Sequence, residues 1–240
     1  MRLVTSFHDE GYDLYGKKFL ESFIEHWDIP LTVYYEIKRD FPVDNRITYK
    51  PLFELERLTD YLSREKIQVI SVINNWKFNL FKFCRKAFIQ AEEMKYEPFF
   101  WIDADVVIDR KPDIDLTDLL GDSLVAYMKR INYHPCTSLV GFNTKHPEMP
   151  EFRHGYINQY LTDDVLTYPE WHDAYVFGRY VNSYVNSKTI YAGNYIDVKN
   201  LCWNIPNEDK GFASNVFNLV LPFARHNKGN LKYEDRVLPM

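Results

Sequence analysis

The chain has 240 residues, of which 46% are hydrophobic and 17% aromatic, enough to bury the core of one large domain. Its formal net charge of -5, without blocks of Lys or Arg, argues against nucleic acid as the main partner, because that binding depends on clustered cations. Its three cysteines lie far apart and form no CxxC pair, so the sequence predicts neither a disulfide framework nor a zinc cluster. No apolar run approaches the roughly 18 residues of a membrane span, and we expect a cytoplasmic protein.

Strands and helices alternate along the chain. Apolar residues at helical spacing predict helices, and β-branched or aromatic runs predict strands. The predicted strands are 2–7, 31–37, 99–108, 123–128 and 136–143. The predicted helices are 14–27, 53–66, 75–94, 146–161 and 169–184. This alternation predicts an α/β protein with one domain, whose central sheet is covered by helices on both faces.

The stretch "FFWIDADVVI" places two carboxylates, Asp103 and Asp105, at the end of an apolar strand. Buried carboxylates need a cation or hydrogen-bond donors, and ligands of open α/β sheets bind beyond the carboxyl ends of strands. Residues two apart on a strand share a face, so both carboxylates could approach one Mn²⁺ or Mg²⁺ ion. A second pair, Asp113 and Asp115, precedes the helix-like "LTDLL", where capping of the helix start explains it.

This strand, together with "LVTSF" at the start of the chain and the basic, aromatic helix before the motif, resembles the GT-A glycosyltransferases that use nucleotide sugars. The resemblance extends to "LVGFNTKHP", "EWHDAYVF" and "FARHNKG" and covers nearly the whole chain. It implies a single GT-A, Rossmann-like domain with a mixed, mostly parallel sheet. Its nucleotide-binding part would span about 1–110 and its acceptor-side part about 111–240.

The resemblance also assigns roles to individual residues. Asp103, Asp105 and His226 would hold the metal, and Asp103 would also lie in the donor site. The remaining donor-site residues that it implies are Thr5, Ser6, Phe7, Lys82, Lys86, Lys228 and Gly229. Among these, Phe7 would stack on the base, and Lys228 and Gly229 would contact the diphosphate of a UDP- or GDP-sugar. For Lys82 and Lys86 a solvated helix face is the competing interpretation.

Asp173, on the first turn of the predicted helix at 169–184, is the candidate catalytic residue. By resemblance it faces the acceptor hydroxyl, as a general base if the reaction inverts the anomeric centre or as a positioning group if it retains it. Capping of the helix start is the competing interpretation. The acceptor would be a carbohydrate, a glycolipid or another hydroxyl compound.

Two other functions fit parts of the sequence. The segment "DADVV" satisfies the motif of haloacid-dehalogenase-type phosphatases, with Asp103 as nucleophile and Asp163 and Asp164 as a later acidic pair. Those enzymes normally carry the motif near the N-terminus, whereas strands and helices precede it here. A sugar- or nucleotide-binding scaffold without activity is the third possibility, which the intact Asp103, Asp105 and His226 oppose.

Overall fold

The computed structural model describes residues 1–64, 66–67, 75–130, 132–191, 197–201 and 220–226. In this part of the chain the main sheet has seven strands. They are β1 (Arg2–Phe7), β2 (Leu31–Tyr35), β3 (Ile47–Pro51), β4 (Phe99–Ile102), β6 (Val125–Met128), β7 (Cys136–Phe142) and β8 (Val198–Asn200). Two further strands, β5 (Val106–Ile108) and β9 (Ala224–His226), pair with each other beside it.

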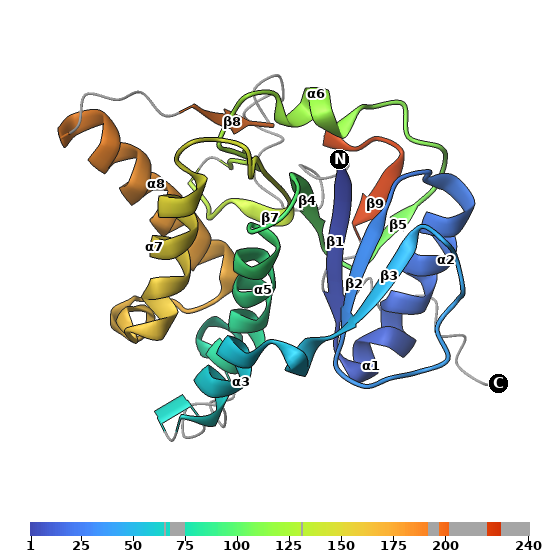
Figure 1. Cartoon of the computed structure of the whole chain (residues 1–240), viewed down its shortest axis with the longest axis horizontal. Helices are drawn as coiled ribbons and strands as arrows, with labels where there is room; N and C mark the ends of the chain where they lie inside the picture. The colour runs from blue at the N-terminus through green and yellow to red at the C-terminus, as the bar shows by residue number, and fades with distance from the viewer. Residues whose placement is uncertain (65, 68–74, 131, 192–196, 202–219, 227–240) are drawn as a thin grey trace.

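The main sheet is mixed, and its order is β3-β2-β1-β4-β7-β6-β8 (Figure 1). Strands β3, β2, β1 and β4 run parallel, and β7 is antiparallel to both β4 and β6. Strand β8 returns parallel to β6. The predicted mixed, mostly parallel sheet is therefore confirmed, and its strands come from both halves of the chain.

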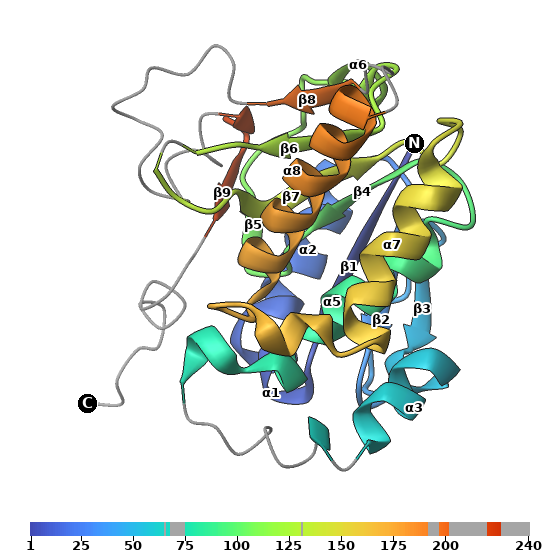
Figure 2. The ribbon, with the colours of Figure 1, turned by 90° about the vertical axis from the view of Figure 1, so that its left-hand side faces the viewer.

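Helices cover both faces of this sheet, as predicted. The α-helices are α1 (Asp9–Gly11), α2 (Lys17–His26), α3 (Glu56–Ser63), α5 (Leu80–Glu93), α6 (Leu116–Leu120), α7 (Met149–Leu161) and α8 (Asp173–Tyr191). The described part of the chain also contains four short turns of π or 3-10 type, namely η1 (Tyr12–Gly16), η2 (Leu52–Glu54), η3 (Trp76–Phe78) and η4 (Asp164–Thr167). In Figure 2, α5, α7 and α8 lie on the near side of the sheet and α2 lies behind it.

The two faces follow from side-chain alternation in the strands. In β4, Phe99 and Trp101 pack into the core under α3, α5, α7 and α8, whereas Phe100 and Ile102 pack into the core under α2 and α6. Every residue of β4 is buried, as expected for a strand covered on both sides.

Gly141 on β7 is the direct partner of Phe100 on β4. A Cβ atom at this position would lie 2.6 Å from the Phe100 ring, too close for any side chain. Glycine therefore allows the Phe100 ring to lie across β7. Phe100 is on β4, the strand that leads directly to Asp103 and Asp105.

The sequence predicted most of the longer elements, and it missed strand β3 and the short strands β8 and β9. The predicted capping role in the second acidic pair is confirmed, because the Asp115 carboxylate accepts a hydrogen bond of 2.7 Å from the Thr117 backbone N–H at the start of α6. Within the described residues, none of the helices combines the length and the apolar character needed to cross a bilayer.

Candidate active site

Asp103 and Asp105 lie in a turn rather than within one strand. Strand β4 ends at Ile102 and β5 begins at Val106, and the Asp103 backbone N–H donates to the Ser138 carbonyl of β7 at 3.0 Å. The predicted continuous strand is therefore wrong, and strand alternation is not what brings the two carboxylates to one side. They converge because the chain turns between two strands that belong to different sheets.

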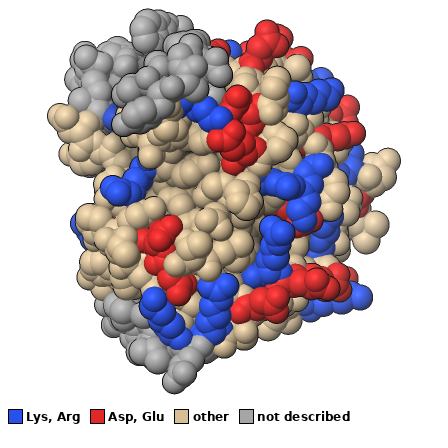
Figure 3. All heavy atoms as spheres, turned by 60° about the vertical axis from the view of Figure 1, so that its left-hand side comes forward, with Lys and Arg blue, Asp and Glu red and all other residues tan. Residues whose placement is uncertain are grey.

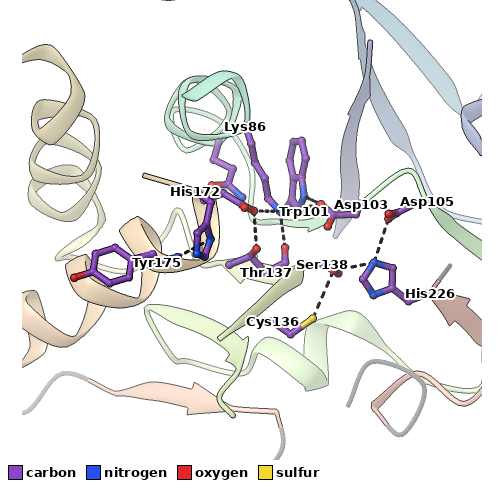
Figure 4. A network of polar contacts seen from close by, with 12 residues as sticks. Lys86, Trp101, Asp103, Asp105, Cys136, Thr137, Ser138, His172, Tyr175 and His226 are labelled. Carbon is purple, nitrogen blue, oxygen red and sulfur yellow. Dashed lines mark hydrogen bonds and ion pairs between the residues drawn. The ribbon is translucent and has the colours of Figure 1, made fainter. Parts of the chain in front are cut away.

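Asp103 is held by two donors from neighbouring elements. Its Oδ1 accepts hydrogen bonds from Lys86 Nζ at 2.8 Å and from Trp101 Nε1 at 2.7 Å (Figure 4). Burial and the nearby Asp105 charge raise the pKa of Asp103, but the Lys86 ammonium and His226 outweigh them and hold this pKa below its ordinary value. Asp103 is therefore ionised at neutral pH.

Asp105 lies beside His226, which comes from a distant part of the sequence. Strand β9 pairs antiparallel to β5 with Val106 opposite His226, and His226 Nε2 lies 3.2 Å from Asp105 Oδ1 and 3.2 Å from Ser138 Oγ. Burial lowers the pKa of His226, but its contacts with Asp105 and Cys136 raise it to about 9. The pairing of β5 with β9 thus delivers an imidazole to the carboxylate pair.

One ligand atom each of Asp103, Asp105 and His226 lies within 4.8 Å of the others, and we call this group the carboxylate site. Two carboxylates and one imidazole form an oxygen-rich donor set of the kind that Mn²⁺ or Mg²⁺ takes in proteins. The carboxylate charges oppose each other, and a divalent cation would relieve that repulsion. The residues present therefore fit such an ion.

Lys86 links the carboxylate site to Asp173. Its Nζ lies 2.8 Å from Asp103 Oδ1 and 2.9 Å from Asp173 Oδ2, and it also donates to the Thr137 carbonyl at 2.8 Å. Burial lowers the pKa of Lys86, but the two carboxylates raise it well above its ordinary value, so the ammonium persists. One cation thus serves two carboxylates from α8 and from the β4–β5 turn.

Asp173 does not cap α8. The residue before it, His172, takes that place, since its Nδ1 accepts a hydrogen bond from the Tyr175 backbone N–H at 3.3 Å. The Asp173 Oδ2 atom instead accepts from Thr137 Oγ1 at 2.7 Å and contacts Lys86. Burial raises the pKa of Asp173, but Lys86 outweighs this effect and holds it below its ordinary value.

The predicted residues of β1 reach the same edge of the sheet. Strand β1 pairs with β4 as far as Val4 opposite Trp101, so Thr5, Ser6 and Phe7 continue past the end of that ladder towards the level of Asp103. Thr5 is fully buried, and Phe7 is 4% exposed, with its ring packed against Tyr12 and Phe41. Other aromatic rings therefore hold the Phe7 ring in place at this edge of the sheet.

The two lysines of α5 separate in the structure. Lys86 points to the carboxylates, whereas Lys82, one turn earlier, is exposed and its ammonium lies 6.0 Å from the Phe83 ring centroid. The solvated-face interpretation therefore describes Lys82, and Lys86 alone of the pair contacts the site. Lys228 and Gly229 lie outside the described residues.

Sequence reasoning missed several residues of this region. Thr137 and Ser138 on β7 contact Asp173 and His226, and nothing in "CTSLVGFN" distinguishes them from other polar strand residues. It also missed a second group of potential ligands, His134, Glu170 and His172, which we call the Glu170 cluster. Here Glu170 Oε2 lies 2.8 Å from His172 Nε2 and 3.3 Å from His134 Nε2, and Lys77 donates to Oε1 at 2.7 Å.

No protein-family model matches the sequence, and no curated protein matches it. Solved glycosyltransferase structures share its fold. The apo structure of the bifunctional glycosyltransferase WbbM superposes with a TM-score of 0.52 at 15% identity, over 95% of this chain and 46% of that one. The glycosyltransferase GlyE of Streptococcus pneumoniae TIGR4 superposes with a TM-score of 0.50 at 14% identity, over 98% of this chain and 56% of that one. This chain therefore has a GT-A-type fold and spans about half the length of these two proteins.

Proposed function

We propose that this protein is a metal-dependent glycosyltransferase that transfers a sugar from a UDP- or GDP-sugar to an acceptor hydroxyl. One observation carries the proposal: the Asp103 and Asp105 carboxylates and the His226 imidazole meet within 4.8 Å at the edge of a GT-A-type sheet. Ligands of open α/β sheets bind at this edge. The likeness to glycosyltransferases of known structure supports the same chemistry.

The charges around this edge favour a cationic cofactor together with the donor. The site has three carboxylates, those of Asp103, Asp105 and Asp173. The Lys86 ammonium and the His226 imidazole lie next to them. A divalent ion held by Asp103, Asp105 and His226 would neutralise the charge that develops on the leaving diphosphate. Thr5, Ser6 and Phe7 would line the nucleoside side, and Lys228 and Gly229, which follow His226 closely in the sequence, would lie on the diphosphate.

Asp173 is suited to orienting the acceptor. Both of its contacts fall on Oδ2, and among the described residues no hydrogen bond or ion pair involves Oδ1. The Asp173 side chain is 16% exposed, so Oδ1 can accept a hydrogen bond from a substrate hydroxyl. Because Lys86 keeps its pKa low, Asp173 is a weak base, and we propose that it positions the acceptor hydroxyl.

Neither alternative function gains support from the structure. The fold is that of glycosyltransferases of known structure, which does not favour a phosphatase with Asp103 as its nucleophile. The proposed acidic partner Asp163 pairs with Arg64 and Lys66 on the surface. An inactive scaffold has no need for a lysine that holds Asp103 and Asp173 together.

Thermal unfolding with Mn²⁺ and nucleotides tests the proposal. UDP or GDP at about 100 times its Kd adds about 2.7 kcal/mol, which raises the Tm of a chain of this size by about 5–10 °C. We expect this rise only when Mn²⁺ is present. The variant Asp105→Asn should lose both the Tm rise and donor-sugar transfer, by about a thousandfold for the latter.

The second acidic pair provides a matched control. Asp113→Asn changes an exposed carboxylate in the same D-x-D pattern, and it should keep the full nucleotide response. If neither nucleotide stabilises the wild-type protein with Mn²⁺, or if Asp105→Asn responds like Asp113→Asn, the proposed site is wrong.

A further inference from the structure

A groove runs along one side of α8, beginning near its first turn. It has a volume of about 690 Å³ and lies between α8, the loop at residues 133–135 and the segment around Tyr168. From α8 it takes Tyr175, Arg179 and Asn182, which recur at three- and four-residue spacing and therefore share one face of the helix. From Tyr175 to the last lining residue, Ser183, the helix rises by roughly 12 Å.

The groove starts at Tyr175, in the first turn of α8, the turn that also carries Asp173. Tyr175 follows Asp173 by two residues, and in Figure 4 its ring points away from Lys86 and the carboxylates. The Tyr175 ring lies 5.0 Å from that of His134, and the His134 ring lies 5.1 Å from that of His172, the residue before Asp173. Aromatic side chains thus lead from the first turn of α8 into the groove.

A glycine sets the width of this groove. A Cβ atom on Gly178 would lie 2.6 Å from Pro135 Cδ, so only glycine allows the 133–135 loop to approach α8 this closely. Tyr133, at the outer end of this loop, is 61% exposed. The loop therefore adds an exposed aromatic ring to the groove lining, with the Arg130 guanidinium 5.3 Å from the centroid of this ring.

The lining indicates what kind of molecule the groove binds. It has four tyrosines and several polar groups, including Gln159, Asn182 and Arg179, and no carboxylate. The Arg179 guanidinium lies 4.5 Å above the Tyr168 ring, which holds it against the wall. Pyranose rings offer apolar C–H faces to aromatic rings and hydroxyls to amides and guanidinium, whereas a single cation is too few for a nucleic acid.

The Glu170 cluster supports the start of the groove and is not a metal site. His172 Nδ1 accepts from the Tyr175 backbone N–H, so its ring proton lies on Nε2 and points at Glu170. A metal ligand needs the opposite arrangement, with a bare Nε2 and a donating Nδ1–H. Glu170 instead fixes the orientation of His172 and His134, and hence of the rings that lead into the groove.

We propose that this groove binds the sugar units of an oligosaccharide acceptor beyond the unit that receives the transferred sugar. The inference rests on the proposed transferase function and adds the class of its acceptor, an extended saccharide. Its non-reacting units would stack on Tyr175 and Tyr133 and bond to Arg179 and Asn182. Figure 3 shows the side of the molecule that lies at the left in Figure 1, where α7 and α8 are found. Part of this surface has no charged side chains, and Lys, Arg, Asp and Glu residues surround it.

A glycan array tests the proposal with defined oligosaccharides, from monosaccharides to longer chains. The fluorescently labelled protein is applied with Mn²⁺ and the nucleotide, and we expect binding that increases from one sugar unit to two or three. Tyr133→Ala and Arg179→Ala should each lower the bound signal by about fivefold or more. Tyr96→Ala, which removes a comparably exposed tyrosine elsewhere, should leave it unchanged.

Thermal unfolding of the same proteins with Mn²⁺ and nucleotide separates the two proposals. All three variants should keep the wild-type nucleotide response. If the response is present but no saccharide binds, or Tyr133→Ala and Arg179→Ala bind like Tyr96→Ala, the groove is not an acceptor site and the transferase proposal stands. If the wild-type protein shows no nucleotide response, the transferase proposal and the acceptor role both fail, even where a saccharide binds.

Discussion

The carboxylate site and the Glu170 cluster look alike as sets of atoms but differ in charge. Each joins histidine to carboxylate with its ligand atoms within 4.8 Å of one another. The carboxylate site, with Asp173 beside it, has three carboxylates around one ammonium and one imidazole. In the Glu170 cluster, a single carboxylate is already balanced by Lys77, and burial lowers the pKa of His172, which stays neutral.

This difference shows that ligand atoms alone do not identify a metal site. The Glu170 cluster has no excess negative charge, and its His172 proton points at the carboxylate. The carboxylate site has excess charge and lies at the sheet edge where ligands of this fold bind. The net charge of each group, rather than the number of His, Asp and Glu residues, therefore separates the two.

The largest expected effect on stability comes from removing the Lys86 ammonium, which lies beside the carboxylate site. Lys86→Met leaves Asp103 and Asp173 without their shared cation, and we expect the free energy of unfolding to fall by about 2–4 kcal/mol without metal. Mn²⁺ should restore part of this loss, because it supplies positive charge to the same carboxylates. Urea unfolding with and without Mn²⁺ measures both effects.

Lys82→Met is the matched control, since Lys82 is exposed one turn earlier on the same helix. It should change stability by less than about 0.5 kcal/mol. Equal stability of the two variants would show that Lys86 does not balance the carboxylates.

The Mn²⁺ affinity should depend on pH through His226. Contacts with Asp105 and Cys136, acting against burial, raise the pKa of His226 to about 9, so without metal the imidazole is protonated at neutral pH. A metal ion must displace this proton, and its affinity should therefore rise with pH, by up to about tenfold per unit below pH 9. Calorimetric titrations at pH 6, 7 and 8 measure the slope.

The variant His226→Asn should bind Mn²⁺ more weakly and with a flatter pH profile over this range. A wild-type affinity that does not change between pH 6 and 8 would argue against His226 as a ligand.

Changing the Glu170 cluster should have the smallest effect on stability and on Mn²⁺ affinity. Glu170→Gln removes the charge that faces Lys77 and His172, and we expect a loss of about 1 kcal/mol in unfolding free energy. The Mn²⁺ affinity should change by less than about twofold, because this carboxylate is not a ligand. If Glu170→Gln lowers the Mn²⁺ affinity as much as Asp105→Asn does, the Glu170 cluster rather than the carboxylate site is the metal site.

Local sequence patterns predicted the helices and strands whose own residues favour that structure. The apolar spacing of α2 and α5 and the apolar run of β4 identified these elements. Strand β3 was missed because "ITYKP" has only one buried residue, and β8 and β9 have three residues each. Such short segments become strands only because a neighbouring strand pairs with them.

The candidate site was predictable as a set of residues but not as a set of contacts. Resemblance to a family pointed to Asp103, Asp105, Asp173 and His226, and the structure brings them together. The sequence could not show that one lysine holds Asp103 and Asp173, or that His172 rather than Asp173 caps α8. Those facts depend on side-chain directions in three dimensions, which residue spacing does not encode.

Strand β9 has a consequence for how the protein matures. It brings His226 to Asp105 across a large sequence separation, and Arg225 beside it pairs with Asp109, 116 positions earlier. During synthesis, the β4–β5 turn leaves the ribosome long before this strand does. The β4–β5 turn can therefore form before His226 is available, and the Asp103, Asp105 and His226 side chains meet only when β9 pairs with β5.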